Sequence, residues 1–221
     1  MTTDVLDRRA PGTLRSDRGR PPHGGGDGGD PQRGDENASR DARAETARVG
    51  LLAFMATVAM LFIGFSSALL LRRASPDWQP LRAPSLLYAS SAALLLSSLT
   101  LAIARRRLLG WDLVGSERYT WATGLLGAGF VAAQLGAWRQ LAQAGVFLAT
   151  NPSSSFFYVL TGVHIVHLLG GLAWFSVVAA RLRRMAFAPG EDGLSLFATY
   201  WHFLGGLWIY LLLLVFGLGG R

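Results

Sequence analysis

The sequence predicts an all-α membrane protein, a polytopic bundle of five transmembrane helices that follows a disordered N-terminal tail. Three observations predict this fold class. Hydrophobic residues make up 51% of the 221 residues. They gather in five charge-free runs of about 20 residues or more, the length that crosses a bilayer. Arginines lie between these runs, and a soluble domain of this size does not bury five such helices completely.

Residues 1–47 form a polar segment that we expect to be a disordered cytoplasmic tail. The stretch contains no Phe, Trp or Tyr and is rich in Gly, Pro, Arg and acidic residues. Such a composition buries too little apolar surface to offset the entropy of ordering. The tail also lacks the apolar stretch of a secretory signal.

Residues 48–221 form the membrane domain, and charged residues bound its spans. The first span ends at Arg72, the second before Arg105, and the third lies between Arg118 and Arg139. The fourth follows the turn sequence "NPSSS" and ends before Arg181, and the fifth follows an acidic loop. The predicted spans are about 50–71, 84–104, 119–138, 155–180 and 195–218.

The distribution of arginine predicts the orientation of the chain. Ten Arg flank the spans on one side: Arg40, Arg43, Arg48, Arg105, Arg106, Arg107, Arg118, Arg181, Arg183 and Arg184. Five lie on the other side: Arg72, Arg73, Arg82, Arg139 and Arg221. Since basic loops stay inside, the N-terminus is expected in the cytoplasm and the C-terminus outside.

Composition excludes several classes of function. Without cysteine, the chain forms no disulfide, thiolate metal site or iron–sulfur cluster. No Asp or Glu lies within a span, which argues against a pump core, a proton channel or an ion transporter. The net charge of +7 comes from arginines at the span ends, a pattern of membrane anchoring that we do not interpret as nucleic-acid binding.

Small residues predict close helix packing, because lipid supplies no hydrophobic force that brings helices together. In the third span they recur every four residues. The residues expected at helix contacts are Gly124, Ala128, Ala132, Gly136, Gly170, Gly171 and Gly205.

Three histidines lie within the spans and are the candidate ligands. His164 and His167 are three residues apart, on nearly the same side of a helix, so the pair cannot hold one haem on both faces. His167 and His202 are expected at similar depths, roughly 20 Å from one membrane face and 10 Å from the other. A three-histidine metal site is one alternative. The favoured reading is structural: neutral imidazoles that bond across helices to Thr161, Gln134, a backbone carbonyl or each other.

Two segments resemble a known family. "TNPSSSFFYVLTGVHIVHLLGGLAWF" (150–175) resembles the most characteristic segment of haem-copper oxidase subunit III, and "YWHFLGGLWIYLLLLVF" (200–216) resembles its last helix. The first two spans are similar to those of its five-helix bacterial forms. The resemblance covers nearly all of 48–217 and leaves the tail uncovered.

The resemblance implies a non-catalytic subunit of a cytochrome c or quinol oxidase in the bacterial inner membrane. Haem and copper are then expected on subunit I, and subunits I and probably II are the expected partners, together with bound phospholipid. No catalytic, cofactor or metal residue is expected in this chain. The binding site for the electron donor lies on other subunits, so this sequence does not distinguish cytochrome c from quinol, nor does it identify the haem.

Two positions depart from the family pattern. Val58 and Ala137 stand where the family often has buried glutamates. The support of proton uptake that the resemblance implies therefore does not carry over to a direct part in proton handling at these two positions. The departures leave open a divergent branch, the subunit III-like accessory protein of nitric oxide reductase. An independent membrane haem or metal protein that uses His164, His167 and His202 is the other alternative.

Overall fold

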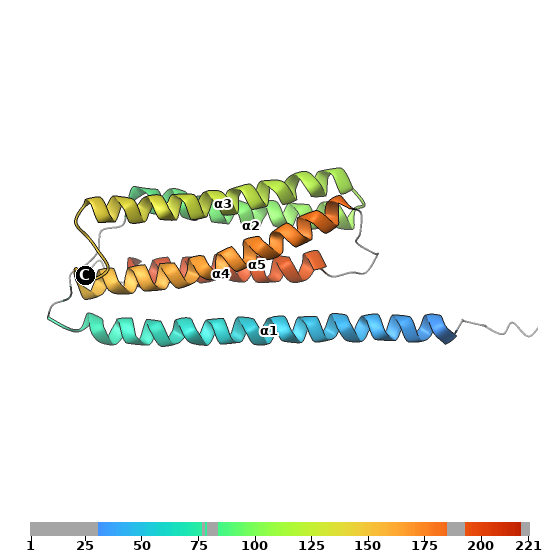
Figure 1. Cartoon of the computed structure of the whole chain (residues 1–221), viewed down its shortest axis with the longest axis horizontal. Helices are drawn as coiled ribbons and strands as arrows, with labels where there is room; N and C mark the ends of the chain where they lie inside the picture. The colour runs from blue at the N-terminus through green and yellow to red at the C-terminus, as the bar shows by residue number, and fades with distance from the viewer. Residues whose placement is uncertain (1–30, 77, 79–83, 185–192, 218–221) are drawn as a thin grey trace, which may run out of the picture. The chain divides into compact units, whose positions relative to one another are not determined.

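The structure, a computed structural model, describes residues 31–76, 78, 84–184 and 193–217. Five helices account for most of them: α1 Pro31–Arg73, α2 Ser85–Leu109, α3 Leu113–Gln143, α4 Pro152–Arg183 and α5 Gly193–Val215. No strand occurs in these ranges. The predicted all-α fold with five helices is confirmed (Figure 1).

Helix α1 begins earlier than predicted. It starts at Pro31, whereas residue 48 was the predicted boundary between the tail and the membrane domain. Extending an existing helix costs little, and residues 38–47 contain four alanines, the best helix former. Over 31–47 the backbone is therefore helical, and the predicted disorder of residues 1–30 lies outside the described residues.

Internal contacts divide the chain into two units, Met1–Ser39 and Arg40–Arg221. Within the described part of the first unit, the backbone forms the start of α1. The second unit holds the rest of α1 and the other four helices, and all the packing described below belongs to it.

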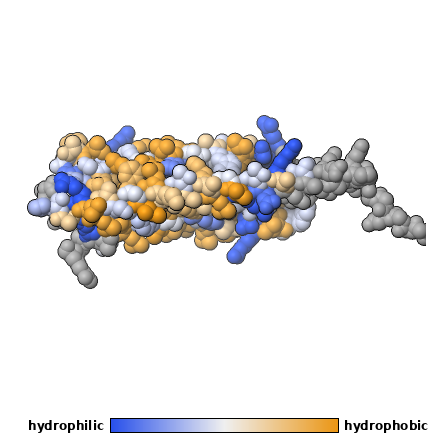
Figure 2. All heavy atoms as spheres, turned by 90° about the horizontal axis from the view of Figure 1, so that it is seen from below, coloured by the Kyte–Doolittle hydropathy of each residue, from blue (hydrophilic) through white to orange (hydrophobic). Residues whose placement is uncertain are grey.

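Four helices have the length and apolar composition to cross a membrane: α1 from Ala42, α2, α4 and α5. Helix α3 is not among them; its charge-free part, residues 119–138, contains four glycines and the polar Gln134. Only three residues connect it to α2, and the two helices pack closely, so α3 returns along the path of α2. The chain is a multi-pass membrane protein, and the face in Figure 2 is hydrophobic between two ends where hydrophilic residues gather.

Capping side chains fix two of the helix starts. The Asp112 carboxylate accepts a 2.9 Å hydrogen bond from the Gly115 N–H and pairs at 2.8 Å with Arg107, which closes the turn between α2 and α3. Asn151 and Ser154 form a reciprocal capping box at the start of α4, with Pro152 in the first turn. These caps begin both helices several residues before the predicted spans.

Close backbone contacts join α2 to α3, α4 to α5, α2 to α5 and α3 to α4. Helix α1 takes part in none of these pairs over its described length. Its side chains instead meet α4 and α5 in an apolar cluster of Val58, Phe62, Leu69, Leu160, Leu211 and Leu214. The larger cluster, between α2, α3, α4 and α5, contains most of the buried aromatic rings.

Candidate functional site: polar groups inside the bundle

A row of hydroxyl groups on α2 accepts hydrogen bonds from the neighbouring helices. The Trp208 indole N–H of α5 donates to Ser91 Oγ at 2.9 Å, and the Trp201 indole donates to Ser97 Oγ at 2.9 Å. Ser97 in turn donates to the Thr123 carbonyl of α3 at 3.2 Å. Buried indole N–H groups need such partners, and interhelical polar bonds stabilise membrane bundles.

Gln134 and Thr161, two of the predicted interhelical polar residues, bond to other helices. The Gln134 side-chain amide donates to Ser90 Oγ at 3.3 Å, which joins α3 to α2. Thr161 accepts from the Trp138 indole at 3.3 Å, which joins α4 to α3. Neither of these bonds involves a histidine, although both residues were candidate partners of the imidazoles.

His164 is fully buried in an aromatic setting. The centroid of its ring lies 5.3 Å from that of the Trp208 ring, with an angle of 31° between the two planes. It lies 6.0 Å from the centroid of the Phe130 ring, and these two rings meet edge-on. Both ring nitrogens and Gln134 Oε1 lack a hydrogen-bond partner among the described residues. This imidazole therefore acts as a packed ring between α3 and α5.

His167 faces a different neighbour, helix α1. Its ring lies 6.0 Å from that of Phe62 and 6.3 Å from that of Phe54. Its Nδ1 lies 2.8 Å from the Val163 carbonyl of its own helix, so this bond does not cross between helices. The Tyr200 hydroxyl of α5 donates to the His167 carbonyl at 2.9 Å. The surroundings of His167 thus join α1, α4 and α5.

The structure does not bring the three histidines together. His164 points between α3 and α5, His167 points to α1, and His202 lies exposed on α5. Three residues along a helix turn a side chain by about 60°, which is enough to reach a different neighbour. The described residues hold no group of three or more His, Asp or Glu that could bind a metal ion. The three-histidine alternative therefore lacks the geometry it needs.

Several predicted glycines lie at close contacts. A Cβ on Gly124 would collide with the Phe175 ring, and one on Gly136 would come within 2.6 Å of a leucine of α2. On α4, a Cβ on Gly171 would lie 3.2 Å from a tyrosine ring of α5. On α5, one on Gly205 would lie 3.2 Å from a serine hydroxyl of α2. Each lets another helix or a large ring approach the backbone.

Ala128, Ala132 and Gly170 lie on exposed surfaces instead. Residues that repeat strictly every four positions rotate by about 40° around the helix at each step. After one or two steps they therefore no longer face the neighbouring helix. Gly127, which the repeat misses, is buried, and a Cβ there would lie 2.8 Å from the Trp201 ring. Spacings that alternate between three and four residues define the packed face of α3.

The two positions where the resemblance leads one to expect glutamates are occupied by buried apolar side chains. Val58 of α1 is 3% exposed and Ala137 of α3 is fully buried. A carboxylate at either position would be buried among apolar groups and would need a partner.

The indole–serine pairs were not predicted from the sequence, nor was the 2.8 Å hydrogen bond that the Tyr210 hydroxyl of α5 donates to Ser66 Oγ of α1. A signal for the indole pairs was present. Trp201 and Trp208 are seven residues apart on α5, and their partners on the antiparallel α2 are six apart. Matching spacings of indoles and hydroxyls on two helices indicate such pairs.

Comparison with known proteins gives consistent matches. The family described as cytochrome c oxidase subunit III matches residues 38–219. Quinol oxidase subunit 3 of Bacillus subtilis is 30% identical over 199 residues, which cover 86% of this chain and 98% of the relative. Cytochrome c oxidase subunit 3 of Thermostichus vulcanus is 30% identical over 174 residues, 76% of this chain and 85% of the relative. A probable cytochrome c oxidase subunit 3 of Nocardia farcinica is 28% identical, with the same coverage of both chains.

Proposed function

We propose that this chain, which belongs to the cytochrome c oxidase subunit III family, stabilises the catalytic subunit of a respiratory haem-copper oxidase and binds phospholipid beside it. The match over residues 38–219 carries the proposal, because it includes all of α2 to α5 and all of α1 beyond residue 37. The chain has the role of subunit III in a haem-copper oxidase, in keeping with its relatives. Its proposed partners are subunit I, which would carry haem and copper, and subunit II.

The interior of the bundle supports a structural role. Gln134, Thr161 and the buried indoles form bonds between helices. The described histidines do not converge on a common point. Such an interior holds five helices in one arrangement and leaves apolar outer faces for lipid and for a large membrane partner.

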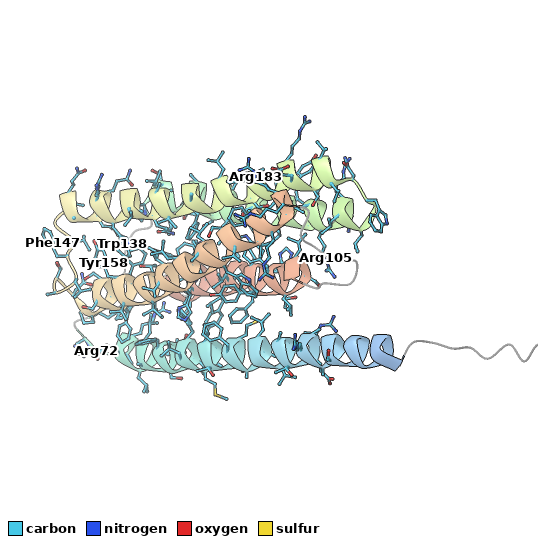
Figure 3. All side chains as sticks on the ribbon, turned by 45° about the vertical axis from the view of Figure 1, so that its right-hand side comes forward. Arg72, Arg105, Trp138, Phe147, Tyr158 and Arg183 are labelled. Carbon is cyan, nitrogen blue, oxygen red and sulfur yellow. The ribbon has the colours of Figure 1, made fainter. Side chains whose placement is uncertain are left out.

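We further propose that the N-terminus is cytoplasmic and the C-terminus lies outside the bacterial inner membrane. The side chains of Arg105 and Arg183 lie at the bundle end opposite Arg72 (Figure 3). The bundle end that holds Arg105 and Arg183 also holds the other arginines in the last turns of α2 and α4. The excess of arginine there favours its cytoplasmic placement.

The names of the relatives favour the oxygen-reducing branch. Those described above are subunits of quinol or cytochrome c oxidases. A quinol oxidase subunit and a cytochrome c oxidase subunit are each 30% identical to this chain. We therefore propose the oxidase class without assigning the electron donor, whose binding site would lie on the partner subunits.

The test is a reduced-minus-oxidised visible spectrum of the tagged chain, purified from its own membranes in mild detergent. We expect haem bands together with a large co-purifying subunit, and we expect both to be lost in harsher detergent. The haem types in the partner would also distinguish an oxygen-reducing oxidase from a nitric oxide reductase. Haem that stays on the stripped chain, or a purified chain without a haem-bearing partner, would refute the proposal.

A further inference from the structure

The loop between α3 and α4, residues 144–151, is uncharged and presents apolar side chains outward. From Gln140 to Ala180 the chain contains no Asp, Glu, Lys or Arg, so the loop continues the uncharged stretch of α4. Phe147 is 58% exposed and Leu148 is 55% exposed. Neighbouring large apolar side chains that are exposed together indicate a surface that another apolar medium or molecule covers.

Side-chain hydroxyls satisfy the backbone of this loop. Four consecutive carbonyls, those of residues 145–148, each accept a hydrogen bond from a hydroxyl group. The pairs are Thr150 to Gly145, Tyr158 to Val146, Ser154 to Phe147 and Ser155 to Leu148. The Thr150 hydroxyl also accepts the Phe147 N–H at 2.7 Å. Carbonyls in water need no such donors, because water supplies them, whereas a loop where water is scarce must satisfy its backbone internally.

The aromatic rings beside the loop place it at the membrane interface. The Tyr158 hydroxyl, 2.9 Å from the Val146 carbonyl, belongs to a ring that meets the Trp138 ring edge-on, with 5.8 Å between centroids. Figure 3 shows both rings and Phe147 at the bundle end that also holds Arg72. Tyrosine and tryptophan gather where the hydrocarbon meets the headgroups. Since Tyr158 bonds to the loop directly, the loop shares the depth of this aromatic pair.

The length of α4 gives the same depth. From Arg181, in the last turn of α4, to Ser155 the helical rise is roughly 39 Å. A bilayer with its headgroups is about 40–45 Å thick. With Arg181 at the charged interface of one side, Ser155 lies inside the headgroup region of the other. Because Ser154, Ser155 and Tyr158 all bond to it, the loop lies back along the first turns of α4 at this depth.

We propose that residues 144–151 are embedded in the membrane interface and that Phe147 and Leu148 insert among the upper acyl carbons of the lipids. The occupant of this surface is the lipid layer itself and not a single bound lipid molecule. Exposed apolar side chains of the flanking helices, Leu135 of α3 and Val159 of α4, continue the lipid-facing surface toward the loop.

The satisfied backbone favours lipid over a protein partner. A protein could supply donors to the loop carbonyls, whereas acyl chains supply none, so a loop among lipids must carry its own. An embedded loop sets the depth of the α3–α4 pair in the membrane. The proposal goes beyond the oxidase role and holds whichever subunits accompany the chain.

The test uses a spin label, because the chain contains no cysteine and a single introduced one reports a single position. Leu148→Cys is made in the full chain, which is purified with its accompanying subunits, labelled with a nitroxide and placed in phosphatidylcholine nanodiscs. The same complex without the introduced cysteine gives the background from labelled partners. Power saturation measures how often the label collides with oxygen, which concentrates in lipid, and with a water-soluble nickel chelate.

Two reference positions calibrate the measurement. Leu125→Cys, on the exposed face of α3, reports lipid, and Ala74→Cys, exposed in the turn after Arg73, reports the aqueous side. We expect the ratio of oxygen to nickel collisions at position 148 to be several-fold higher than at position 74. A ratio equal to that at position 74 would place the loop in water, and few collisions with both reagents would mean that a protein covers it. Either result would overturn the proposal.

Removing the hydroxyl donors tests the physical reason for the proposal. Tyr158→Phe with Ser155→Ala leaves the carbonyls of Val146 and Leu148 without these donors, so the loop should move toward water and the ratio at position 148 should fall. Ser176→Ala is the matched control, because this exposed α4 hydroxyl bonds only within its own helix, at 2.7 Å to the Ala173 carbonyl. Helix content by circular dichroism verifies that each variant is folded. An unchanged ratio in the folded double variant, or an equal fall in the control, would overturn the role of the hydroxyls in embedding the loop.

Discussion

Ser97 joins three helices, and its removal should measurably weaken the bundle. Its hydroxyl accepts from the Trp201 indole of α5 at 2.9 Å and donates to the Thr123 carbonyl of α3 at 3.2 Å. Ser97 and Trp201 are both fully buried, so Ser97→Ala leaves an indole N–H without a partner in an apolar setting. We expect the free energy of unfolding to fall by about 2 kcal/mol, since a buried unpaired donor costs ~1–3 kcal/mol.

A double-mutant cycle with Trp201→Phe isolates the bond itself. Each single variant and the double variant are unfolded with SDS in mixed micelles, and helix content is followed by far-UV circular dichroism. The Ser97 bond to Thr123 is intact in Trp201→Phe, so the coupling free energy reports the indole–hydroxyl pair. We expect about 1 kcal/mol, between the ~0.6 average and the ~1.7 maximum for interhelical bonds in a membrane protein.

Trp174→Phe supplies the matched control for this cycle. The Trp174 ring packs against the rings of Phe197 and Tyr200 and is not the partner of Ser97. Its effect should add to that of Ser97→Ala within about 0.5 kcal/mol. A coupling for Trp201 no larger than that of this control would refute the view that indole–hydroxyl bonds hold α2 to α5.

Three further predictions concern other parts of the bundle. His164→Phe should keep or raise the free energy of unfolding in the same assay, because it replaces a buried imidazole without hydrogen-bond partners by an apolar ring. His164→Ala should lower the free energy of unfolding by about 2–3 kcal/mol, because it leaves a cavity. A large loss with Phe would contradict this prediction. Gly127→Leu should cost about 1–3 kcal/mol through its clash with an indole, and Gly170→Leu, on the exposed face, should cost little; equal losses would contradict the packing described. A hydrogen bond from the Gly115 N–H and the Arg107 guanidinium hold the pKa of Asp112 below its usual value, so the contribution of Asp112 to stability is present near neutral pH and is lost as the pH falls through that lowered pKa. Asp112→Asn should therefore flatten the acid side of the curve of unfolding free energy against pH. An unchanged acid side would argue against the cap.

The spans were predictable because an absence of charge over about 20 residues has one physical meaning in a chain with arginine-rich loops. The helix ends were not, since Asp112, Asn151 and the alanines before residue 48 extend the helices beyond the apolar runs. Caps and propensity act outside the lipid, where hydropathy gives no signal.

The partners of the histidines needed the three-dimensional arrangement. His164 and His167 share one side of α4 in a coarse view, yet a turn of about 60° sends one toward Trp208 and the other toward Phe62. Ala128 and Ala132 are exposed for the same reason. A four-residue repeat rotates around the helix at each step, and the sequence pattern alone does not show which of its members face a neighbouring helix.

The long side chains through which α1 meets its neighbours have a consequence for biosynthesis. Helix α1 leaves the ribosome first, but its partners α4 and α5 are made last. Until then α1 must remain in the bilayer alone, and it contains the most apolar window of the four helices that qualify as spans. Its Ser66 hydroxyl meanwhile has a partner in its own helix, the Phe62 carbonyl at 2.7 Å. Helices α2 and α3, joined by a three-residue turn, can pair at once, so the order of synthesis makes α1 a late addition to a bundle that begins without it.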